Sequence, residues 1–194
     1  DARLAEVRSF DTAGGEEAGR AAGRAVQQAS LAIAELEEAV TLSKEGDWGK
    51  RLAQQKRSLA LSVESRLKEI ENAVGQALPV QSLRYGARLI KSAPKLAGDP
   101  DPTAIRKARS LLAFAEEVRS SADTGGFGST RSRILESIEK HIDPYVEELL
   151  EHLRSPDIDN PDRTRAFLEV AADILSLAKD EKAGQIVRRR LAAA

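Results

Sequence analysis

Residue types that commonly carry catalysis or bind metals are scarce in this chain of 194 residues. It has no cysteine, and its two histidines are His141 and His152. On one helix they would lie about 16 Å apart along the axis, too far for one metal ion to bind both. Glu148 and His152 have the i, i+4 spacing of a weak metal site or of a surface pair. We therefore expect no metal site here.

Carboxylates and serines are plentiful, but they do not fall into a catalytic pattern. No Glu-x-x-His pair recurs as in di-iron bundles, and no serine lies in a G-x-S-x-G context. The segment GGFGSTR (125–131) could hold an anion before a helix. It lacks the lysine of a phosphate-binding loop and a preceding strand, so a flexible connector anchored by Phe127 is the simpler interpretation. We predict that the chain is not an enzyme and needs no cofactor.

Basic residues give the clearest candidate binding surface. Segment 72–98 contains no acidic residue, and four bases follow one another at spacings of 4, 3 and 4: Arg84, Arg88, Lys91 and Lys95. On a helix they would form one stripe beside an apolar face. Such a helix could dock on nucleic acid, an anionic membrane or an acidic partner. Alternatively, its apolar face packs internally and its basic face is solvated or pairs with acidic residues elsewhere.

Three glycines recur at every fourth residue near the start of the chain: Gly15, Gly19 and Gly23. Each glycine inside a helix costs about 1 kcal/mol relative to alanine. Their shared side would let a neighbouring backbone approach closely, so we expect a helix contact there, either within the chain or with a second subunit. The charged residues between them, including Glu17 and Arg20, argue against a contact inside a membrane.

Apolar periodicity predicts two long helices that position these residues. The first spans about 16–44 and the second about 48–78, separated by the break KEGDWGK. Each carries a heptad-like apolar seam, which indicates a coiled-coil-like antiparallel hairpin. The first helix ends in acidic residues and the second begins with basic ones, which supports the antiparallel arrangement: Glu35, Glu37, Glu38, Glu45 and Lys50, Arg51, Lys56, Arg57.

Shorter helices are predicted for the rest of the chain, at about 79–92, 102–120, 130–153 and from Pro161 onward. Asp101 and Asn160 each precede a proline and are expected to cap the helices that follow. Pro144 predicts a kink or a fresh start, and Gly184 an interruption. Period-2 alternation is not sustained anywhere, so we predict no sheet.

Together these features predict an all-α fold, with a long antiparallel helical hairpin and a bundle of shorter helices packed on it. We expect a flexible leader at 1–13, the hairpin and the short basic helix at 14–98, and a helical segment at 99–194 continuous with them as one domain. Aromatic residues make up only 4% of the chain, so the core must be mainly aliphatic.

The functional expectation is a non-enzymatic scaffolding, adaptor or regulatory protein that acts through helix–helix contacts with a protein partner. The alternative is a regulator that binds nucleic acid or an anionic membrane surface through the basic helix 80–95. The net charge of −1 argues against wholesale coating of nucleic acid. We also expect a homodimer through the hairpin. The expected location is the cytoplasm, unless the sequence is the soluble part of a longer chain.

Overall fold

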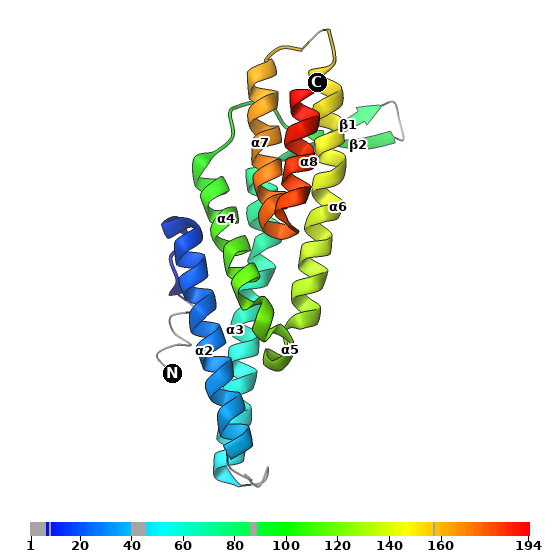
Figure 1. Cartoon of the computed structure of the whole chain (residues 1–194). Coiled ribbons are helices and arrows are strands. Elements are labelled where there is room, and N and C mark those ends of the chain that lie inside the picture. Colours follow the sequence, from blue (N-terminus) through cyan, green and yellow to red (C-terminus); the bar gives the residue numbers. More distant parts are fainter. Residues whose placement is uncertain (1–6, 8, 40–45, 86–88, 157) are drawn as a thin grey trace. The chain divides into compact units, whose positions relative to one another are not determined.

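The computed structural model describes residues 7, 9–39, 46–85, 89–156 and 158–194. Its longer helices are α2 (Gly15–Ala39), α3 (Asp47–Ala77), α4 (Pro102–Glu117), α6 (Gly128–Leu153), α7 (Pro161–Ala178) and α8 (Glu181–Ala192) (Figure 1). Shorter elements are η1 (Thr12–Gly14), η2 (Val118–Ser121), α5 (Ala122–Gly125) and the strands β1 (Val80–Tyr85) and β2 (Leu89–Pro94). The predicted all-α class is confirmed.

The chain forms two compact units. The first contains Asp1–Ile70 and Ser110–Ile134, and the second contains Glu71–Arg109 and Leu135–Ala194. The boundary falls within α3, α4 and α6, so each of these helices contributes residues to both units.

In the first unit, α2 and α3 run antiparallel, as the sequence predicts (Figure 1). Their seam is buried where Val26, Leu59 and Val63 lie, and it opens toward the far end of α2, where Leu36 is 50% exposed. Lys56 occupies a seam position, and its Nζ donates to Glu37 at 3.1 Å. This ion pair joins the acidic end of α2 to the basic start of α3 as expected.

The segment before α2 packs against the helices. Val7 is fully buried, and the ring of Phe10 stacks on Phe114 with centroids 5.5 Å apart. The guanidinium of Arg66 lies 5.1 Å from the Phe10 ring centroid and also donates to the Val7 carbonyl at 3.3 Å. Val7 and Phe10 of the expected loose leader therefore contact α3 and α4, whereas residues 1–6 and 8 lie outside the described residues.

The connector between α4 and α6 is more structured than predicted. The serine- and glycine-rich stretch forms η2 and α5, and Gly126 ends α5 with a left-handed φ of 78°. Phe127 is fully buried, which confirms its expected anchoring role. Arg131 connects the start of α6 to α4 by donating a hydrogen bond to the Ala115 carbonyl at 2.7 Å.

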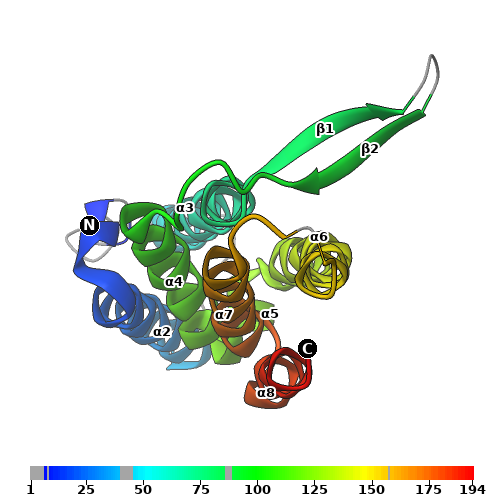
Figure 2. The same ribbon diagram turned by 90° about the horizontal axis from the view of Figure 1, so that it is seen from above.

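The second unit contains an antiparallel two-stranded ribbon where the sequence predicted a helix. β1 pairs with β2 from Val80↔Pro94 to Tyr85↔Leu89, and Figure 2 shows the ribbon extending away from the helices of its unit. The predictions of a helix over 79–92 and of no sheet are therefore wrong. Two six-residue runs joined by a short glycine-containing segment are typical of a hairpin, and this pattern prevails over the helical spacing of the bases.

Two expected interruptions are also absent from the helices of this unit. α6 runs continuously through Pro144, so the kink or fresh start at Asp143 is not a helix boundary. The chain instead breaks after α7 at Lys179, and Asp180 caps α8 by accepting from the Ala183 amide at 2.8 Å. Gly184 therefore lies inside α8, and the predicted interruption there is wrong.

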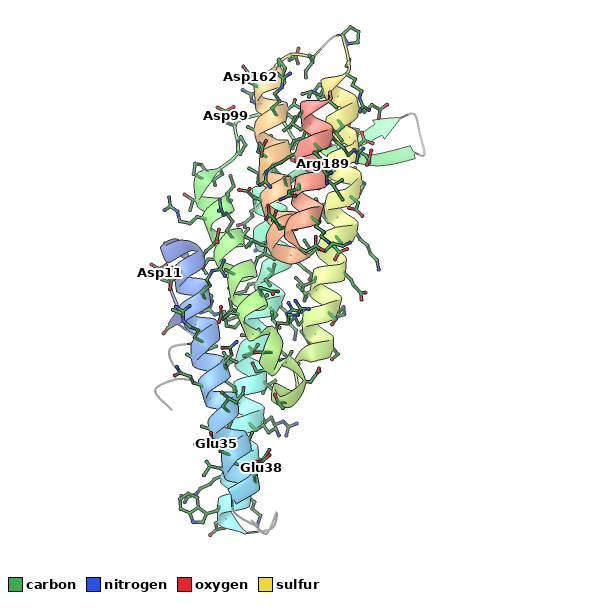
Figure 3. The ribbon with its side chains drawn as sticks, in the orientation of Figure 1. Asp11, Glu35, Glu38, Asp99, Asp162 and Arg189 are labelled. Atoms are coloured by element: carbon green, nitrogen blue, oxygen red, sulfur yellow. The ribbon has the colours of Figure 1, made fainter. Side chains whose placement is uncertain are left out.

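The expected caps and a set of ion pairs fix the ends of α4 and α7. Asp101 accepts from the Thr103 amide at 2.8 Å, and Asn160 accepts from the Arg163 amide at 3.0 Å. Arg163 also pairs with Asp99 at 3.0 Å, near the start of α7 where Figure 3 labels Asp99 and Asp162. These contacts hold the segment that leads into α4 against the first turn of α7.

Candidate functional site

The glycines predicted to mediate a helix contact lie against α4, within the first unit. A Cβ atom on Gly19 would lie 2.9 Å from the carbonyl carbon of Ser110 and closer still to its oxygen. A Cβ on Gly23 would lie 2.6 Å from Cγ of Glu117. Real Cβ atoms do not approach so closely, so both glycines are required for this packing. The contact is made inside the chain.

Gly15 has a different position from the other two glycines. It is the first residue of α2 and has a φ of 69°, a left-handed conformation that favours glycine. Its backbone N–H closes the preceding 3-10 turn by donating to Thr12. Gly15 therefore serves the turn into α2, and its role as a helix-contact residue stays a prediction.

The basic residues do not form the predicted helical stripe. Arg84 pairs with Ile90 and Lys91 pairs with Leu83, so their register positions fall on opposite faces of the ribbon. Arg88, and the side chains of Arg84 and Lys91, lie outside the described part of the structure. Lys95 follows β2, is exposed, and donates its backbone N–H to the Pro79 carbonyl at 2.8 Å. The spacing argument for one basic face is therefore wrong.

A surface hollow lies in the second unit, between α6 and α8, and we call it the α6/α8 groove. Its volume is about 430 Å³. It is lined by Glu139, Asp143, Val146 and Glu147 of α6, by Leu175 at the end of α7, by Lys179 and Asp180 of the connection, and by Lys182, Ala183, Ile186, Val187 and Arg190 of α8. Figure 2 shows α8 beside α7, with α6 facing both.

The floor of the groove is apolar. Val146, Leu175 and Val187 are each at least 95% buried, whereas Ile186 is 50% exposed. A half-exposed isoleucine at the edge of an apolar floor adds to the surface that a partner could cover. The floor is thus suited to receive aliphatic side chains.

The two rims of the groove carry opposite charges. Glu139, Asp143 and Glu147 follow at intervals of four on α6, so they lie along one helix face. The opposite side carries Lys182 and Arg190 on α8, together with Lys179 and the acidic Asp180 of the connection. Asp143 and Lys182 form no ion pair with any described residue. Asp143 lies midway between Glu139 and Glu147 and helps to raise the pKa of Lys179, whereas Lys182, eight residues before Arg190, lies at the Glu139 end of the groove.

Ion pairs bridge the groove at both ends. Lys179 Nζ donates to Glu139 at 2.7 Å, and this bond raises the pKa of Lys179. Arg190 donates through two nitrogens to both carboxylate oxygens of Glu147, each at 2.6 Å. This double hydrogen bond lowers the pKa of Glu147 and raises that of Arg190. Both pairs are partly exposed, so they mainly fix geometry.

Gly184 determines how closely α8 approaches α7. A Cβ at this position would lie 2.5 Å from the Ala172 carbonyl oxygen and 3.2 Å from Cβ of Ser176. Because glycine has no Cβ, the backbones of α7 and α8 can pack closely at Gly184.

A smaller hollow of about 210 Å³ lies in the first unit, among α2, α3 and α5. Ile33, Ala34 and Leu59 give it an apolar side, and the Glu37–Lys56 ion pair lies at its edge. The Ser30 hydroxyl is buried with no hydrogen-bond partner among the described residues. The ionic groups of Glu37 and Lys56 pair with each other, and Asp123 of α5 adds a carboxylate to the lining.

His141 lies beside Tyr145 in α6. Nε2 of His141 and the hydroxyl of Tyr145 are both buried without a partner in the described part of the structure, with ring centroids 6.3 Å apart. Burial raises the pKa of Tyr145. Among the described residues, no group of three or more His, Asp or Glu side chains is arranged to hold a metal ion. None of the helices in the described ranges has the length and apolarity needed to cross a bilayer.

Sequence reasoning missed the α6/α8 groove, although a signal was present. The acidic residues of α6 and the residues Lys182, Ile186 and Arg190 of α8 both recur at intervals of four, which marks two one-sided helix faces. Comparisons of the chain with protein-family models, curated proteins and solved structures find no match.

Proposed function

We propose that this chain is a non-enzymatic scaffolding or adaptor protein that binds an amphipathic helix in the α6/α8 groove. The observation that supports this proposal is the combination of an aliphatic floor with two oppositely charged helical rims. Helix-in-groove binding uses this combination, because apolar anchors provide affinity and the rims set the orientation. The expected location, the cytoplasm, stays a prediction.

The dimensions of the groove limit the bound helix. Its α6 rim runs from Glu139 to Glu147, which is eight helical rises or about 12 Å. A helix lying along it would place three or four apolar side chains, at spacings of three and four, over Val146, Leu175 and Val187. The contact is short, so a single helix of modest affinity is the expected partner.

The rims select the charges of this helix. The side facing Asp143 should be basic and the side facing Lys182 should be acidic. A helix with two acidic sides would meet repulsion at Asp143, and a helix with two basic sides would meet it at Lys182. A helix with one side of each sign can satisfy both rims by choosing one of its two directions.

The alternative function, binding of nucleic acid or an anionic membrane through 80–95, was argued from a helical basic stripe. Because the segment forms β1 and β2, that argument no longer applies. The groove gives the more specific hypothesis.

Three designed peptides test the proposal. All three carry the same leucine stripe. In the mixed peptide one side of the stripe is acidic and the other basic, in the acidic peptide both sides are acidic, and in the basic peptide both are basic. In fluorescence anisotropy at low salt, the mixed peptide should bind most tightly. Ile186→Glu should abolish binding by placing a charge at the floor, whereas Leu31→Glu, at a 63% exposed position on α2, should not change it.

A charge reversal on the rim sharpens the peptide test. Lys182→Asp makes both rims acidic, so the preference should move to the basic peptide. The proposal is refuted if none of the peptides binds at high micromolar concentration, or if Ile186→Glu leaves binding intact.

A further inference from the structure

We propose that the hollow among α2, α3 and α5 is a binding site for a small amine that has an apolar body and also carries a hydroxyl group. All residues of this site belong to the first unit, so the inference is independent of the α6/α8 groove.

The volume of the hollow limits the size of its ligand. It measures about 210 Å³ and lies where α5 meets α2 and α3 (Figure 1). For comparison, an apolar cavity of about 150 Å³ holds one benzene molecule. The hollow therefore has room for a single ring with a short chain, whereas drug-sized ligands occupy pockets of about 300–1,000 Å³.

One wall of the hollow is apolar. It is formed by Ile33 and Ala34, which are partly buried on α2, and by Leu59, which is buried on α3. A hydrocarbon body placed against these side chains would be removed from water, and this removal is favourable in proportion to the apolar area covered. The wall thus accounts for the apolar part of the ligand.

Ser30 supplies an unused hydrogen-bonding group. The residue is 7% exposed and lines the hollow, and its hydroxyl has no hydrogen-bond partner among the described residues. A buried polar group without a partner is destabilising, and a serine hydroxyl can both donate and accept a hydrogen bond. A hydroxyl group on the ligand would give it the missing partner.

The charged lining residues favour a cation over an anion. Glu37 and Asp123 are acidic and Lys56 is basic, so two negative charges and one positive charge leave a net charge of −1. Both carboxylate oxygens of Glu37 accept from Lys56 Nζ at 3.1 Å, so these two charges compensate each other. The remaining negative charge of the lining is therefore that of Asp123.

Asp123 is the expected partner of the amine. It is exposed, and it forms no ion pair with any described residue. Its Oδ1 lies close to Gly128 of α6, where a Cβ would be 2.6 Å away, but a carboxylate has acceptor sites on both of its oxygens. A protonated amine in the hollow can therefore donate a charge-assisted hydrogen bond to Asp123.

Tyramine is a suitable probe for the full chain, because its single ring carries an aminoethyl group at one end and a hydroxyl at the other. Two analogues each lack one polar group: para-ethylphenol lacks the amine, and phenethylamine lacks the hydroxyl. In isothermal titration calorimetry, tyramine should have the lowest dissociation constant of the three. In para-hydroxyphenylacetate a carboxylate replaces the amine, and this analogue should bind most weakly because it meets the charge of Asp123.

Two variants assign each polar group of the ligand to one residue. Asp123→Asn should raise the dissociation constant of tyramine about tenfold and leave that of para-ethylphenol nearly unchanged, because only tyramine has the amine. Ser30→Ala should weaken the binding of tyramine about threefold to tenfold, but not that of phenethylamine. Asp159→Asn removes an exposed charge from the second unit, and as the control it should leave every constant unchanged.

The free Ser30→Ala chain gives a second measurement. Alanine is the better helix former and leaves no hydroxyl without a partner, so this variant should unfold at the same temperature as wild type or a higher one. A lower affinity for tyramine in this variant therefore cannot result from unfolding. Circular dichroism makes the same check for Asp123→Asn, and the comparison of ligands on the wild-type chain does not depend on either variant.

The inference is supported if each variant weakens only the ligands that carry the matching polar group. It is overturned if tyramine shows no saturable binding at millimolar concentration, or if the carboxylate analogue binds more tightly than tyramine. It is also overturned if either variant binds tyramine as wild type does, or weakens the analogue without the matching group as strongly. Ile186→Glu should leave tyramine binding unchanged, so this result and the test of the α6/α8 groove can fail separately.

Discussion

Replacing Gly19 with alanine is the most direct test of the packing between α2 and α4. An alanine at an interior helix position gains about 1 kcal/mol over glycine when nothing opposes it. At Gly19, however, the added methyl group would collide with the Ser110 carbonyl and approach the Phe114 amide nitrogen to 3.1 Å. Both are backbone groups, which cannot rotate away as a side-chain end can.

The expected net effect follows from these two opposing contributions. Overpacking a close contact costs about 1–3 kcal/mol, and a backbone collision belongs at the upper end. Subtracting the gain in helix propensity of about 1 kcal/mol leaves a loss of about 2 kcal/mol in the free energy of unfolding. For a chain of this size the loss should lower the Tm by about 4–8 °C.

Gly75 provides a matched control. It lies in the last turn of α3 and is exposed, and a methyl group added there would have no neighbouring atom within 4 Å. Gly75→Ala should therefore raise stability, by less than the roughly 1 kcal/mol of an interior helix position, through propensity alone. Gly23→Ala should fall between the two, because the collision is mainly with the Glu117 side chain.

Urea and thermal unfolding followed by circular dichroism at 222 nm would measure this series. The expected order of stability is Gly75→Ala, wild type, Gly23→Ala and Gly19→Ala, from highest to lowest. If Gly19→Ala is as stabilising as Gly75→Ala, then α2 and α4 do not pack closely, and the explanation of the glycine spacing is wrong.

Three further predictions concern other contacts. Gly184→Ala should destabilise the chain by about 1–2 kcal/mol in urea unfolding, because its methyl group would collide with Ser176 and an α7 carbonyl; a stabilised variant would contradict this. Phe10→Ala should speed limited proteolysis before α2, since the ring stacks on α4; an unchanged cleavage rate would contradict that packing. Glu147→Gln should cost less than about 1 kcal/mol at pH 7. Arg190 lowers the pKa of Glu147, so this stabilisation is present above the ordinary glutamate pKa and is lost as the pH falls through the lowered value. Wild type and variant should therefore converge in urea unfolding at pH 3, and a persistent difference there would refute the pairing.

Apolar periodicity and capping residues correctly predicted the helices that depend on residues near one another in the sequence. The seam residues Leu59, Val63 and Leu67 are buried in α3 as the period indicated, and Asn160 caps α7. The helical spacing of four bases predicts a helix over 79–92, but the two short runs on either side of Gly86 pair as β1 and β2. Spacing alone does not distinguish a helix from a hairpin in so short a segment.

Contacts between distant residues could not be predicted in the same way. The sequence indicated that something approaches Gly19 closely, but the partner, Ser110, lies 91 positions later in the chain. Likewise, the rims of the α6/α8 groove come from helices separated by α7. The packing of all the helices together decides which two helices face each other. The residue pattern of a single helix does not contain this information.

Pro144 gives the α6 rim a particular mechanical property. Proline has no amide hydrogen, so the carbonyl of Lys140 lacks its usual helical donor, although α6 continues through this turn. Pro144 is exposed, so water can satisfy the freed carbonyl. The helix is thus softest against bending beside Asp143, at the midpoint of the rim, while ion pairs clamp both ends. We therefore expect the α6 rim to bend more easily than α8. The width of the groove could then adjust to side chains of different size without unfolding either helix.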